Sequence, residues 1–185
     1  KRAPGWLAAS NSDVEWAGAS ILDHHHCQIF RDLTLPLEEA HELARHDSSG
    51  CSATMLQWPG PVMRLRGNAD GVVAAATTAT ERWKSQAPGA NTVNFLARVV
   101  SGGELCMHLI FRNPAFRTLP PVTEIKREGV GIIEVSGEII VPPLPDKSRP
   151  ANVEYFQANG LKLCREIIAM NTPKPANMDL LGLLD

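Results

Sequence analysis

The chain has 185 residues, of which 44% are hydrophobic and 21% are charged, and its formal net charge at pH 7 is −2. These values are typical of a globular protein with a substantial core, and without a basic excess they do not favour nucleic acid as a partner. No apolar run approaches the roughly 18 residues that span a bilayer, and no signal segment opens the sequence. Four scattered cysteines without a C-x-x-C pair favour reduced thiols, so we expect a soluble, cytoplasmic protein without a membrane partner.

The first predicted elements are two short strands separated by a loop of small residues. Residues 6–10 predict a strand that ends at the turn-forming cluster 11–13. The loop Gly18-Ala19-Ser20 follows, and alternation over 24–30 predicts a second strand.

The middle of the chain predicts a helix and a hairpin after a less regular stretch. Residues 33–45 suit a short helix or an irregular crossing, and 47–52 an exposed loop. After an extended run at 62–65, Asn68 is a good N-cap for a helix over 69–84. The remaining elements are a hairpin of strands 92–100 and 104–111 that turns at Ser101-Gly102-Gly103.

The last part of the chain predicts one more strand pair and a helix. Residues 131–135 and 139–141 predict strands, and 153–170 a helix. The proline-rich tail, 172–185, is expected to be loosely attached to a domain that covers 1–171. The whole pattern predicts an α+β fold with a mainly antiparallel sheet and flanking helices.

The most informative residues for function lie between Gly18 and Gln28. On a strand His24, His26 and Gln28 share one face, with the two imidazoles roughly 6.5–7 Å apart along the chain. A neutral imidazole is a competent nucleophile near pH 7, and a loop of small residues brings backbone N–H groups close to phosphate oxygens. The residues therefore indicate nucleophilic attack by a histidine on a phosphate group.

The run Gly18-Ala19-Ser20-x-x-x-His24-x-His26-x-Gln28 resembles the active-site strand of the histidine triad superfamily. It is similar to the branch with a final glutamine, which includes galactose-1-phosphate uridylyltransferase and diadenosine tetraphosphate phosphorylase. The segments 94–98 and 108–112 also resemble phosphorylase-like members. The resemblance covers residues 5–143 and implies a HIT-like fold.

The resemblance implies a role for each matching residue. His26 would be the nucleophile, with His24 and Gln28 as the other catalytic residues. The residues that would bind the nucleotide or its phosphates are Asn11, Gly18, Ala19, Ser20 and Arg112. Arg112 and Arg117 either bind a distal phosphate or sugar or form surface salt bridges.

Other features of this stretch favour structural roles. His25 faces away from His26 and is expected to be structural, Cys27 is expected to pack in the core, and Asp23 either orients His24 or caps a turn. Three consecutive strand histidines cannot all face one metal ion. Zinc-binding members of the branch use cysteines from an N-terminal portion that we do not find in this sequence, so we assign no metal site, although zinc stays an alternative.

The resulting hypothesis is nucleotidyl transfer through a covalent nucleotidyl-histidine, by a phosphorylase or transferase acting on a sugar nucleotide or dinucleoside polyphosphate. The resemblance of segments 94–98 and 108–112 to phosphorylase-like members slightly favours phosphorolysis. The alternative is a non-catalytic nucleotide-binding or interaction module. Members of the branch pair two chains or fold one chain as two half-domains, so a homodimer and a monomer both stay open.

Overall fold

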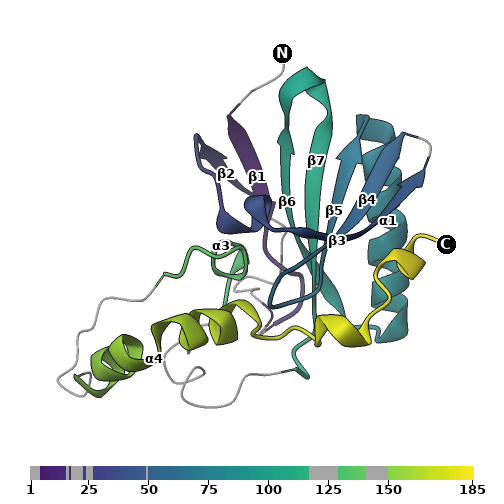
Figure 1. Ribbon diagram of the computed structural model, residues 1–185. Helices are drawn as coiled ribbons and strands as arrows, with labels where there is room; N and C mark the ends of the chain where they lie inside the picture. The colour runs from purple at the N-terminus through teal and green to yellow at the C-terminus, as the bar shows by residue number, and fades with distance from the viewer. Residues whose placement is uncertain are drawn as a thin grey trace.

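The computed structural model describes residues 5–15, 17, 23, 27–48, 50–116, 129–140 and 150–185, without the side chains of 150–156 and 177. Among these residues, seven strands form one antiparallel sheet in the order β2-β1-β6-β7-β5-β4-β3, with helices on both faces (Figure 1). The strands are β1 (Trp6–Ser10), β2 (Cys27–Arg31), β3 (Glu42–Ser48), β4 (Cys51–Leu56), β5 (Val62–Gly67), β6 (Thr92–Val99) and β7 (Leu105–Arg112). The predicted α+β fold with a mainly antiparallel sheet is confirmed.

Three α-helices and four short 3-10 turns complete the described part of the chain. They are α1 (Ala69–Gln86), α3 (Ile132–Val135), α4 (Pro150–Ile168), η1 (Pro36–Glu39), η2 (Ser101–Gly103), η3 (Pro175–Asn177) and η4 (Leu181–Leu183). Among the described residues, no helix has both the length and the apolar character needed to cross a bilayer.

Helix α1 forms where the sequence predicts it. The side chain of Asn68 accepts a hydrogen bond from Gly71 N at 2.8 Å, which satisfies one free donor of the first turn. Its buried face, Val72, Ala76, Ala79 and Trp83, lies against β4–β7. The hairpin β6–β7 is likewise confirmed, and Gly102 adopts a φ of 82° in its turn.

The sheet separates two hydrophobic cores. One face packs against η1, α3 and α4, with Leu7, Ala9, Leu96 and Ile110 contributed by the strands. The other face packs against α1 and the C-terminal turns. Leu180 is fully buried and Leu183 is 5% exposed in this second core, so the prediction of a loosely attached tail is wrong. Burial of these two leucines attaches the C-terminal segment to the second core, although its prolines suggested a free end.

Several predicted elements differ from the structure. Residues 33–45 form η1 and the start of β3 and no α-helix, because β3 pairs with β4 at the edge of the sheet. The predicted loop 47–52 is largely strand: Asp47 and Ser48 end β3, Cys51 and Ser52 begin β4, and Gly50 between the strands has a φ of 82°.

Residues 131–135 form helix α3 and no strand. The carboxylate of Glu134 accepts a hydrogen bond from Gly131 N at 2.7 Å, and this local capping contact favours a helical turn over the strand that Ile132, Ile133 and Val135 suggested. Residues 139 and 140 lie outside any strand, and residue 141 is not among those described.

Candidate functional site

The described part of the site is the hairpin β1–β2 and the residues that hold it. Gln28 pairs with Ala9 and Cys27 with Ser10, and β1 lies between β2 and β6 (Figure 1). His24, His25, His26 and the loop Gly18-Ala19-Ser20 lie outside the described residues. Of the predicted site residues, the structure therefore describes three, which are Asn11, Gln28 and Arg112.

Gln28 lies on the same face of the sheet as the first core. Its cross-strand neighbour Ala9 is fully buried, and Gln28 and Phe30 are half-buried, whereas Cys27 and Ile29 are exposed. The prediction that Gln28 and Cys27 lie on opposite faces of the strand is confirmed. The prediction that Cys27 packs in the core is wrong, because α1 packs on β4–β7 and leaves the outer face of β2 exposed.

Asn11 directly follows strand β1, which ends at Ser10, and connects it to helix α3. Its Oδ1 accepts a hydrogen bond from Ile132 N at 2.9 Å. This contact fixes the amide of Asn11 next to the first core, at the point where the chain leaves β1 toward the predicted phosphate loop.

Asp13 fastens the same connection to β6 and α1. Its carboxylate accepts hydrogen bonds from Thr92 Oγ1 at 2.5 Å and from Lys84 Nζ. Burial alone would raise the pKa of Asp13, but the hydrogen bonds from Lys84 and Thr92 outweigh it, so the pKa lies below its ordinary value. The carboxylate is therefore charged near neutral pH and holds residues 11–13 in place.

Arg112 is fully buried at the end of β7. Its Nη1 donates to Ala17 O, to Val130 O at 2.7 Å and to the Asn94 amide oxygen at 3.2 Å. Its Nη2 donates to Met170 O and to Asn171 Oδ1, both at 3.2 Å.

Burial lowers the pKa of Arg112 to about 9, although nearby Glu134 opposes the shift, so the guanidinium is charged near neutral pH. The alternative of a surface salt bridge is wrong. The structure places the guanidinium inside the fold, where its terminal nitrogens donate to protein acceptors. Arg117 lies outside the described residues.

A groove of about 530 Å³ runs between α1 and the sheet. Its floor is apolar and comprises Val93, Phe95, Met107 and Leu109, and Ser10 and Asn11 lie among its lining residues. Phe95 pairs with Ser10, on the opposite face of the sheet from Gln28. The groove is therefore separate from the face that carries the motif glutamine.

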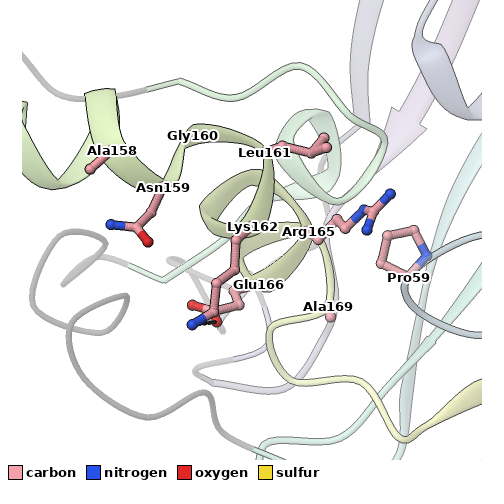
Figure 2. A pocket seen from close by; sticks show the side chains of 9 residues that line it. All are labelled: Pro59, Ala158, Asn159, Gly160, Leu161, Lys162, Arg165, Glu166 and Ala169. Atoms are coloured by element: carbon pink, nitrogen blue, oxygen red, sulfur yellow. Dashed lines mark ion pairs between the residues drawn. The ribbon is translucent and has the colours of Figure 1, made fainter.

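A second cavity, of about 650 Å³, lies where α4 is kinked at Asn159 (Figure 2). Lys162 and Glu166 form an ion pair of 3.8 Å on its wall, and the side chain of Arg165 extends toward Pro59. None of the residues predicted from the motif lines this cavity.

The described residues do not form a metal site. Among them no group of three or more His, Cys, Asp or Glu side chains could hold an ion, and Cys27, Cys51, Cys106 and Cys164 are free thiols in separate places. The donors among the described residues do not fit a zinc site.

Sequence reasoning missed three residues that hold the site. Asn94, Asn171 and Asp13 support Arg112 or the connection after β1 through buried or partly buried polar contacts. Their partners lie 18 to 84 residues away along the chain, so no local spacing could reveal them.

The chain is similar to galactose-1-phosphate uridylyltransferases of known sequence. The protein of Streptococcus pneumoniae serotype 4 is 32% identical over 164 residues, which cover 76% of this chain and 33% of the relative. The protein of Latilactobacillus sakei is 30% identical over 183 residues, which cover 84% and 36%. These matches confirm the resemblance to the uridylyltransferase branch.

The chain spans about one third of the length of these relatives. No family model and no solved structure matches it.

Proposed function

We propose, since the chain is a relative of the galactose-1-phosphate uridylyltransferases, that it carries part of a site for nucleotidyl transfer from a sugar nucleotide. An imidazole nitrogen of His26 attacks the α-phosphorus, and the bond from that phosphorus to the bridging oxygen breaks. The sugar 1-phosphate leaves, and a nucleoside monophosphate stays on His26. A second sugar 1-phosphate then attacks the same phosphorus and releases the histidine.

The observation that carries this proposal is the position of the motif residue Gln28 in the sheet. Gln28, the last motif residue, lies on β2 beside the buried Ala9, on a hairpin whose other strand ends at Ser10, directly before Asn11. A rigid strand holds reacting groups more accurately than a loop, and accurate placement supplies much of the rate enhancement in phosphoryl chemistry.

The remaining motif residues act on the phosphates. Gln28 and Ser20 donate hydrogen bonds to non-bridging oxygens, and the small side chains of Gly18 and Ala19 leave the backbone N–H groups accessible. His24 supports His26 from the same predicted face.

The names of the relatives favour a uridine diphosphate sugar as donor and a sugar 1-phosphate as acceptor. This transfer takes precedence over the phosphorolysis that the resemblance of segments 94–98 and 108–112 suggested. The competing function is a nucleotide-binding module without turnover. A covalent bond at His26 separates the two, because a binding module leaves the histidine unmodified.

The test is intact mass spectrometry of the full natural protein after incubation with UDP-glucose, other sugar nucleotides and dinucleoside polyphosphates. We expect one nucleoside monophosphate adduct that is acid-labile and is removed by a sugar 1-phosphate. His26→Ala should abolish the adduct, and His25→Ala is the matched control that should retain it.

An adduct that persists in His26→Ala would assign the nucleophile to another residue. No adduct with any donor, from folded protein, would favour the binding module.

A further inference from the structure

The connection between β1 and the predicted phosphate loop is held at its two ends by two side chains that contact each other, Asn94 and Arg112. Asn94 Nδ2 donates to Ser10 O at 3.2 Å, where β1 ends, and Arg112 Nη1 donates to Ala17 O, directly before Gly18. Arg112 also donates to the Asn94 amide oxygen at 3.2 Å. Both side chains are fully buried, and they come from the neighbouring strands β6 and β7.

The rest of the guanidinium is fastened to the body of the protein. Its other hydrogen bonds reach Val130 O before α3, and Met170 O and Asn171 Oδ1 after α4. A planar guanidinium holds several acceptors in fixed directions, which an ammonium group cannot do. The position of Ala17 is therefore coupled to α3, to the end of α4 and to the central strands.

We propose that Arg112 and Asn94 are positioning residues, which fix the backbone at Ser10 and Ala17 and thereby the point from which the loop Gly18-Ala19-Ser20 continues. This inference rests on the proposed function of that loop. Arg112 then contributes to nucleotidyl transfer without touching the substrate, because a loop that binds phosphate through backbone N–H groups depends on the position of its first residue.

The experiment compares Arg112→Lys and Asn94→Ala with a control outside the contacts of Arg112, Asn68→Ala. Asn68 accepts a hydrogen bond from Gly71 N at the start of α1, so this variant weakens the fold and removes no contact of Arg112 or Asn94. Two quantities are measured on the full protein: the rate of adduct formation at saturating UDP-sugar, and hydrogen exchange of the backbone amides at 18–20.

We expect Arg112→Lys and Asn94→Ala to slow adduct formation by about 100-fold with donor affinity little changed, since a small misplacement of reacting groups costs about that factor. Exchange at 18–20 should accelerate in both variants. Asn68→Ala should lower thermal stability and leave both readouts at their wild-type values. Asn94→Ala keeps Arg112 in place and decides the question if the lysine variant does not fold.

Wild-type rates in Arg112→Lys or Asn94→Ala, or equal slowing in Asn68→Ala, would overturn the proposal. If the wild-type protein forms no adduct, the proposed function fails, and hydrogen exchange at 18–20 still decides whether the two residues position the loop.

Discussion

Protonation of His108 is expected to make the protein sensitive to mild acid. His108 lies on β7 with 3% of its surface exposed, and its Nε2 is buried without a partner among the described residues. Burial lowers its pKa to about 3, and the positive charges of Arg64 and Arg98 act in the same direction. The folded protein therefore keeps this imidazole neutral at a pH where the unfolded chain protonates it.

The sign and size of the effect follow from linkage. Because the folded pKa lies below the unfolded value of about 6.5, the unfolded state binds the extra proton, and stability falls as the pH falls from about 6.5 toward 3. Between about pH 7.5 and about pH 5 this one group should lower the free energy of unfolding by about 2 kcal/mol.

Urea denaturation of the wild type and of His108→Leu at both pH values measures this contribution. The leucine variant removes the titrating group, so the stability difference between variant and wild type should change by about 2 kcal/mol in favour of the variant at the lower pH. His46→Gln, at an exposed position on β3, controls for the loss of a histidine. Parallel pH dependences in wild type and His108→Leu would refute the reasoning.

Three further predictions test the fold. Asn68→Ala should cost about 1 kcal/mol in thermal denaturation, and Asn68→Asp, which keeps the acceptor, should cost less. Leu180→Ala should cost about 2–5 kcal/mol, since it empties space in the second core, against less than about 0.5 kcal/mol for the exposed Leu161→Ala; equal effects would mean that the tail is not part of the core. The lowered pKa of Asp13 means that its contribution is present above the ordinary value of 3.8 and is lost as the pH falls below it, so Asp13→Asn should flatten the acid limb of a stability profile; an unchanged limb would count against the contacts of Asp13 with Lys84 and Thr92.

The sequence predicts the elements whose pattern is local. Strand β1 has the predicted bounds, α1 begins at its predicted cap, and the β6–β7 hairpin turns at its glycines. Each of these signals depends on neighbouring residues alone, which is why the sequence suffices.

Strand β3 carries no such local signal. All residues of β3 are exposed, so it shows no apolar alternation and becomes a strand only by pairing with β4. In the site, the motif predicts the face of Gln28. It cannot predict that Arg112 is buried, because the acceptors of that guanidinium come from residues as far apart as Ala17 and Asn171.

The short pairing between β1 and β6 predicts the order in which the parts of the protein unfold. Only three residue pairs join these strands, Ala8–Ala97, Ala9–Leu96 and Ser10–Phe95, whereas β6 and β7 share eight. A short ladder opens at a lower free energy than a long one, so the β1–β2 hairpin is expected to behave as a separate cooperative unit that detaches before β4–β7 unfold. The side-chain contacts of Asp13 with Thr92 and of Asn94 with Ser10 hold this unit against β6.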